Sequence, residues 1–196
     1  ILRSIRQRKA HNNIMRSGIG VGGYCLTKDP LFAKAASQQI LQRKFDFPLS
    51  SKAVEVNQQM TFDVMSEIKK KFFKSIKNKK LLIIGVSYRE DTNDTRYSPA
   101  EKVFDFFKKM RCKLEFYDPI VNYWEYQKTY SIEKKDLKNF DVYVFLIKHQ
   151  MFKRLKIPYK KKSLILDLNH VLGREKRLKV SKSKNYQSYF IGSNQL

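Results

Sequence analysis

The sequence predicts an α/β protein whose carboxyl-terminal part, residues 79–196, is an open parallel sheet. Short apolar runs bounded by charged residues, at 81–86 and 142–147, are typical of strands buried on both faces of such a sheet. Helical patterns alternate with these runs, and this alternation indicates a Rossmann-like, doubly wound arrangement. A long central helix and a glycine-rich loop precede the sheet.

The helices before the sheet follow from turn and spacing signals. Residues 31–36, directly after Pro30, predict a short helix. A longer connecting helix is predicted over 51–77, because its inward positions recur at spacings of three and four: Val54, Asn57, Thr61, Val64, Met65, Ile68, Phe72 and Ile76. The chain is therefore divided into three parts, residues 1–50, 51–78 and 79–196.

The elements of the sheet region are bounded by capping and turn residues. Ser98 as cap, Pro99 at the first helical position and Glu101 three residues after the cap predict a helix that continues through Met110. Residues 113–117 alternate like a strand, and further strands are predicted at 142–147 and 164–167. Ligands of such sheets bind at the carboxyl ends of the strands.

Composition excludes several classes of protein. The 196 residues carry 41 Lys and Arg against 18 Asp and Glu, a net charge of +23, while 42% hydrophobic residues are enough for a core and argue against disorder. The charge attracts anions, but the lysines are spread along the chain, and there is no zinc-finger spacing or RNA-recognition strand pair. We therefore favour a solvated lysine-rich surface and expect no nucleic-acid partner.

Membrane, secretion and metal signals are absent from the sequence. Apolar runs of about six residues are far shorter than the roughly 20 residues of a spanning helix, and no apolar signal core follows the basic start. We expect no membrane partner. Two cysteines and three histidines, all scattered, support neither a disulfide framework nor a metal site, which favours a cytoplasmic setting.

A glycine-rich loop delivers a cysteine. Gly18, Gly20 and Gly23 fit the letters of the dinucleotide fingerprint, but no apolar strand precedes them, so a cofactor cradle is disfavoured. The glycines allow close approach of a ligand to the backbone, and Cys25 follows with Lys28 nearby. A thiolate is nucleophilic near a cation or a helix start, so Cys25 is either a nucleophile or a small buried hydrophobe. Cys112, at a helix end, is interpreted as structural.

Two motifs resemble the same known family. Residues 20–30, Gly-Val-Gly-Gly-Tyr-Cys-Leu-Thr-Lys-Asp-Pro, closely resemble the catalytic-cysteine motif of the UDP-glucose/GDP-mannose dehydrogenase family. Residues 85–99 are similar to that family's Gly-x-x-Phe/Tyr-Lys-x-x-Thr-x-Asp-x-Arg-x-Ser-Pro segment, and residues 117–119 follow at the family's distance. The resemblance covers nearly the whole chain.

The resemblance implies a nucleotide-sugar 6-dehydrogenase. Members of the family have an amino-terminal NAD-binding domain, a central helical segment that forms a homodimer and a carboxyl-terminal domain that binds the nucleotide. The chain starts at Ile1, just before the cysteine loop, so we expect a central and carboxyl-terminal fragment that lacks the NAD-binding domain and is inactive alone. The implied reaction oxidises the C6 alcohol of a UDP-sugar to a carboxylate with two NAD, for polysaccharide precursor synthesis.

The resemblance also implies roles for single residues. Cys25 carries the thiohemiacetal and thioester, Asp29 serves the hydrolytic water, and Lys28 is a basic group near cysteine and cofactor. The substrate-binding positions are Gly20, Val21, Gly22, Arg89 and Lys9. Arg96, with Lys28, matches a position near the cofactor phosphates; Asp94 either orients Arg96 or forms a turn. Arg8 or Lys9, and His11, lie at positions where some members of the family contact the substrate of the neighbouring subunit of the dimer.

Departures and alternatives remain. Ser17 replaces a usual Pro, and residues 168–170, Leu-Asn-His, replace a common Gly-Arg turn. His149 and His170 are interpreted as ordinary surface or turn histidines. The alternatives to the dehydrogenase are a basic polyanion-binding protein and a non-catalytic fragment that binds a UDP-sugar.

Overall fold

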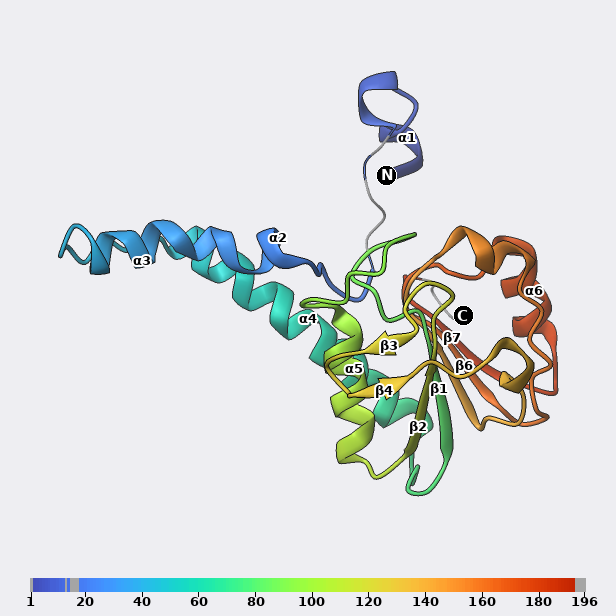
Figure 1. Cartoon of the computed structure of the whole chain (residues 1–196). Helices are drawn as coiled ribbons and strands as arrows, with labels where there is room; N and C mark the ends of the chain where they lie inside the picture. Colours follow the sequence, from blue (N-terminus) through green and yellow to red (C-terminus); the bar gives the residue numbers. More distant parts are fainter. Residues whose placement is uncertain (1, 13, 15–17, 193–196) are drawn as a thin grey trace.

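The centre of the structure is a parallel sheet. The computed structural model describes residues 2–12, 14 and 18–192, and five strands form the sheet in the order β2-β1-β5-β6-β7 (Figure 1). The strands are β1 (Lys80–Ile84), β2 (Lys113–Tyr117), β5 (Val142–Phe145), β6 (Leu164–Asp167) and β7 (Gln187–Phe190). All four pairings are parallel. The predicted open parallel α/β sheet is confirmed.

The sheet is covered on both faces because its strand residues alternate in direction. Leu81 and Ile83 belong to one buried cluster, which includes Ile68 of the long helix α4. Leu82 and Ile84 belong to the opposite cluster. The covering helices are α4 (Pro48–Phe72) and α5 (Pro99–Lys109) on the first face and α6 (Arg174–Lys182) on the second.

Helix α5 begins where its start signals predict. The Ser98 hydroxyl accepts a hydrogen bond from the Ala100 N–H at 3.2 Å, and Pro99 occupies the first turn. Val103 and Phe107 face the core and are fully buried. The cap is local chemistry, and this is why the sequence alone predicts it.

Helix α4 differs from the prediction at both ends. It begins at Pro48, a residue suited to the first helical turn, rather than near residue 51. It ends at Phe72 because Phe73 takes an extended conformation, with φ −119° and ψ 93°. Ile76 is nevertheless buried in the core. Its helical spacing from Phe72 therefore reflects burial and not helix.

The remaining helices lie in the amino-terminal part. They are α1 (Leu2–Ile5), η1 (Lys9–His11), α2 (Tyr24–Lys28), η2 (Asp29–Leu31) and α3 (Phe32–Gln39). Helix α2 and η2 contact α4, while α3 extends away from the sheet and α1 stands apart from it (Figure 1). In the described ranges no helix is both long and apolar enough to cross a membrane.

Short elements fill the connections between the strands. A small antiparallel hairpin, β3 (Tyr123–Trp124) with β4 (Thr129–Tyr130), follows β2 and was not predicted. Trp124 of this hairpin is fully buried and packs edge-on against Phe104 and Phe116. Single turns η3 (Lys134–Asp136) and η4 (Gln150–Arg154) flank β5.

Candidate active site

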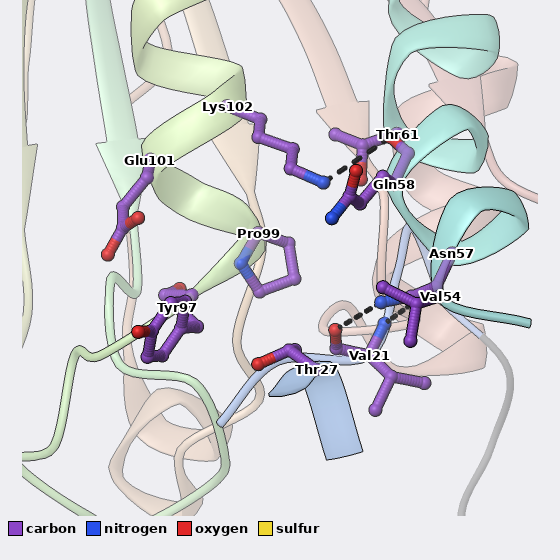
Figure 2. Close-up of a pocket in the computed structure, with 11 residues that line it drawn as sticks. Val21, Thr27, Val54, Asn57, Gln58, Thr61, Tyr97, Pro99, Glu101 and Lys102 are labelled. Carbon is purple, nitrogen blue, oxygen red and sulfur yellow. Dashed lines mark hydrogen bonds between the residues drawn. The ribbon is translucent and has the colours of Figure 1, made fainter. Parts of the chain in front are cut away.

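The glycine-rich loop is clamped on one side by helix α4. The Asn57 amide donates to the Val21 carbonyl and accepts from the Val21 N–H, both at 2.8 Å. One turn further along α4, the buried Thr61 hydroxyl donates to the Ile19 carbonyl at 3.0 Å. Figure 2 shows the paired bonds between Asn57 and Val21. Two polar side chains on the inner stripe of α4 thus fix the loop that leads to Cys25.

The opposite wall of the loop is the segment before helix α5. A Cβ on Gly22 would lie 2.8 Å from both the Tyr97 carbonyl oxygen and Pro99 Cδ. Gly23 has a φ of +89°, and a Cβ there would lie 2.9 Å from the Tyr88 ring. Only glycine combines this conformation with this approach. The glycines therefore let the loop fit between α4 and residues 88–99.

A small pocket opens between these two walls. Its volume is about 130 Å³, and it is lined by Val21, Thr27, Val54, Asn57, Gln58, Thr61, Tyr97, Ser98, Pro99, Glu101 and Lys102 (Figure 2). Burial raises the pKa of Glu101, although the backbone N–H groups of Ser98 and Tyr97 oppose this shift. Burial also lowers the pKa of Lys102. The pocket carries one acid and one base whose charges are partly desolvated.

Cys25 stands at the exposed start of helix α2. It is a free, exposed thiol, and Lys28 and Asp29 follow it three and four residues later in the chain. Lys28 Nζ lies 3.9 Å from Asp29 Oδ1 and 3.8 Å from the centre of the Tyr24 ring. Lys28 thus contacts both Asp29 and the neighbour of Cys25, Tyr24.

The second sequence motif meets the cysteine loop at Tyr24. The Arg96 guanidinium carbon lies 5.2 Å from the centre of the Tyr24 ring, and Tyr97 packs edge-on against the same ring at 5.5 Å. Asp94 accepts three hydrogen bonds from the Arg96 side chain and one from its N–H, and the side-chain bonds lower the pKa of Asp94. Asp94 thus both orients Arg96 and forms the turn.

Arg89 lies on the loop after β1, at the carboxyl edge of the sheet. Its side chain is exposed, and its carbonyl accepts a hydrogen bond from the Ser87 hydroxyl at 2.8 Å. The same edge receives Asn169, whose side chain occupies the space that a Cβ on Gly18 would need. Residues 168–170, which differ from the usual Gly-Arg turn, therefore border the glycine loop. Ser17, the other departure, lies outside the described residues.

His149 corrects the prediction of an ordinary surface histidine. Its side chain is fully buried, with Nε2 3.1 Å from Asp118 Oδ2 and Nδ1 accepting the Asp91 N–H at 3.0 Å. Burial disfavours the charged form of Asp118, but hydrogen bonds from His149 and the Val86 N–H outweigh it and lower the pKa of Asp118. Three loops meet at this histidine, and nothing in its local sequence indicates that.

Other predicted residues lie apart from this site. Lys9 is exposed in η1, which stands away from the sheet (Figure 1). Cys112 is partly buried, and burial raises its pKa to about 11, consistent with a structural thiol. In the part of the chain that the structure describes, no three His, Cys, Asp or Glu side chains are placed to hold a metal ion.

Sequence reasoning missed the two clamp residues. Asn57 and Thr61 fit the inner stripe of α4 and were counted there with apolar positions. A polar side chain on a buried helical stripe needs a hydrogen-bond partner, and this was the available signal. The partner itself, a loop more than 30 residues away, could not be read from the pattern.

Comparisons with known proteins support the resemblance to the dehydrogenase family. Residues 82–174 match the UDP binding domain of the UDP-glucose/GDP-mannose dehydrogenase family. A UDP-N-acetyl-D-mannosamine dehydrogenase of Methanococcus aeolicus is 33% identical over 161 residues, which cover 82% of this chain and 34% of the relative. A UDP-glucose 6-dehydrogenase of Rickettsia prowazekii is 25% identical over 195 residues, covering 92% of this chain and 43% of the relative.

Solved structures show the same fold. The UDP-D-ManNAc dehydrogenase of Pyrococcus horikoshii superposes with a TM-score of 0.66 and 25% identity, over 97% of this chain and 43% of that one. The NDP-N-acetyl-D-galactosaminuronic acid dehydrogenase of Methanosarcina mazei gives a TM-score of 0.72 at 22% identity, over 92% and 40% of the two chains. The chain thus spans less than half the length of these relatives.

Proposed function

Since the chain belongs to the UDP-glucose/GDP-mannose dehydrogenase family, we propose that it forms the catalytic-loop and nucleotide-binding portion of an NAD-dependent UDP-sugar 6-dehydrogenase. The observation that supports this most is the meeting of the two motifs at Tyr24. It brings the loop of Cys25 against the segment that carries Arg96. A nucleophile and a cation from distant parts of the sequence thereby border one site.

The proposed chemistry at Cys25 conserves atoms and electrons. Oxidation of the C6 alcohol releases a hydride and a proton and leaves an aldehyde, to which the Cys25 thiolate adds to form a thiohemiacetal. The thiohemiacetal oxygen takes up one proton as it forms; loss of that proton and of a second hydride gives a thioester, and water then releases the carboxylate, a proton and the thiol. We assign to Asp29, four residues after Cys25, the role of accepting a proton from that water.

NAD accepts the two hydrides when it is bound. The described residues fit it only in part: Arg96 and Lys28 present two cations around Tyr24 that suit phosphate oxygens, but no strand leads into the glycine loop to form a dinucleotide cradle. We therefore assign Arg96 and Lys28 to cofactor contact and most of the cofactor site to residues outside this chain. Alone, the 196 residues should form no NADH.

The nucleotide of the substrate is proposed to bind along the loops at the carboxyl edge of the sheet. Arg89 offers a planar fork for the diphosphate, and the backbone of Gly20, Val21 and Gly22 borders the sugar end. Arg8, Lys9 or His11 would have to come from the second subunit. The product, a UDP-linked uronate, would supply polysaccharide synthesis in the cytoplasm.

A homodimer through α4 is proposed from its outer face. Besides its buried stripe, α4 carries exposed apolar residues at spacings of four, three and four: Leu49, Ala53, Val56 and Met60. Leu49 is 85% exposed and Val56 is 52% exposed. This is the spacing of a helix-packing seam, which a second copy of the same helix would cover. The glycine loop packs on a different face of α4, through Asn57 and Thr61.

The test of the proposed activity uses this chain joined to an NAD-binding domain of the family. The joined enzyme should form two NADH for each UDP-linked carboxylate. Cys25→Ser should nearly abolish formation of the carboxylate, because the serine hydroxyl is a far weaker nucleophile at neutral pH, while Cys112→Ser should stay within about twofold of the parent. Similar activities of the two serine variants would refute the assignment of the nucleophile.

A further inference from the structure

The strand order identifies where the sheet can form a ligand crevice. From β1 the chain moves to β2 on one side and later returns to β5 on the other, so the order reverses between β1 and β5. In open α/β sheets, ligands bind outside the carboxyl ends of the strands at such a reversal, next to the loops that leave them. Here those loops are residues 85–98 and 146–150. Gly85, with φ +85°, packs directly on Ile147, where a Cβ would lie 2.7 Å from the Ile147 side chain.

His149 lies on the β5 loop and is hydrogen-bonded to residues of the β1 and β2 loops. Its Nδ1 accepts the Asp91 N–H at 3.0 Å, so Nδ1 carries no proton and Nε2 is the donor. Nε2 faces Asp118 Oδ2 at 3.1 Å and the Ser87 hydroxyl oxygen at 3.3 Å. The Ser87 hydroxyl in turn donates to the Arg89 carbonyl at 2.8 Å. One imidazole therefore contacts both ends of the turn that carries Arg89.

The Asp118 carboxylate is itself held in place by backbone hydrogen bonds. Its carboxylate accepts the N–H groups of Val86 at 2.8 Å, Ile120 at 2.9 Å and Val121 at 3.1 Å, and it is fully buried. Asp91 links the turn to the β5 loop a second time, because its Oδ1 accepts a hydrogen bond from the Gln150 N–H at 2.9 Å. The turn at 87–91 cannot shift against the β5 loop without breaking at least one of these bonds.

We propose that His149 is a positioning residue for nucleotide binding: its neutral imidazole holds the turn at 87–91 so that Arg89 faces the crevice between β1 and β5. The inference rests on the proposed function, in which Arg89 binds the diphosphate of a UDP-sugar. The bond that matters most is the one from the Asp91 N–H to Nδ1, because it fixes the turn directly. The bond to Asp118 orients the ring.

Two substitutions separate these bonds. His149→Asn places an amide oxygen where Nδ1 was, so it keeps the Asp91 contact and loses the contacts of Nε2 with Asp118 and Ser87. His149→Gln reaches Asp118 with its amide nitrogen but offers Asp91 no acceptor at the Nδ1 position. Each variant loses one of the two main hydrogen bonds, so their melting temperatures should fall by similar amounts. A merely structural role would therefore affect both variants alike.

Titration of the 196-residue chain with UDP provides the readout. His149→Asn should bind UDP within about twofold of the wild type, while His149→Gln should bind about fivefold or more weakly, the change expected for one lost hydrogen bond that orders the site. Hydrogen exchange at the Asp91 N–H should stay slow in the first variant and become fast in the second.

The possible outcomes separate the two hypotheses. If the wild type binds UDP and the variants lose affinity equally, or neither loses any, His149 has no positioning role and the proposed function stands. If the wild-type chain binds no UDP, the proposed nucleotide site is wrong and this inference fails with it.

Discussion

Replacing Gly22 by alanine tests whether the glycine loop is held between two rigid walls. Gly22 does not have a positive φ, so alanine tolerates its backbone conformation and the substitution probes space alone. The new methyl would lie 2.8 Å from the Tyr97 carbonyl oxygen and from Pro99 Cδ, and 3.1 Å from Tyr88 Cβ. None of these atoms is the end of a flexible side chain, so the loop must move.

The magnitude follows from what the movement breaks. Overpacking a filled site costs about 1–3 kcal/mol. The loop can avoid that cost only by leaving the clamp, which breaks two hydrogen bonds to Asn57 and one to Thr61, together worth about 3 kcal/mol. We therefore expect local opening of the loop to become easier by about 1–3 kcal/mol, which is roughly 5- to 150-fold in the opening equilibrium.

Hydrogen exchange of the peptide that contains Val21 is the assay, because the Val21 N–H donates to Asn57. Gly22→Ala should speed its exchange by about tenfold or more. Gly173→Ala is the matched control, since no atom lies within 4 Å of a Cβ at that position. Unchanged exchange at Val21 in Gly22→Ala, or equal acceleration in both variants, would refute the two-wall description.

Three further substitutions test other parts of the structure. Asp167→Asn should lower the free energy of unfolding, measured in urea, by about 3 kcal/mol, because the buried carboxylate pairs with Arg177. Asp141→Asn removes one partner of an exposed pair and should cost less than about 1 kcal/mol, so equal costs would contradict this prediction. Leu49→Glu should convert a dimer to monomers in sedimentation, and Leu178→Glu on α6 should not; a Leu49→Glu dimer would exclude the seam. Burial raises the pKa of Cys112 to about 11, so the buried neutral thiol contributes its full stabilisation below pH 9, and this contribution is lost as the pH rises towards 11. The urea midpoint of the wild type should fall over this range, and Cys112→Ser should lack this fall.

Local patterns determined how much could be predicted. Strands β1, β2, β5 and β6 and the start of α5 depend on residues within a few positions, such as Ser98 and Pro99, so periodicity and capping rules were enough. Strand β7 and the β3–β4 hairpin were not predicted. The end of α4 was predicted wrongly because Ile76 continues the burial pattern after the helix stops. A periodic pattern records which side chains are buried, and an extended residue can bury one as well.

The candidate site also contains residues that a local pattern predicts and residues that it does not. Cys25, Lys28 and Asp29 lie within one turn, so a short motif contained them. His149 and Asn57 act on partners 58 and 36 residues away, and their role exists only once β1, β5 and α4 are assembled. Contacts between distant loops leave no spacing signal in a single sequence.

The central claim is that this basic chain binds a sugar nucleotide through a few placed groups. Calorimetric titration of the 196-residue chain with UDP-glucose and with a short oligonucleotide, at about 50 and 200 mM salt, tests it most directly. We predict saturable UDP-glucose binding that falls about tenfold in Arg89→Ala, the loss expected for a charge-assisted contact, and is unchanged in Lys161→Ala or Lys162→Ala. Tight oligonucleotide binding that falls steeply with salt and weakens equally in all three variants, with no UDP-glucose binding, would contradict the claim.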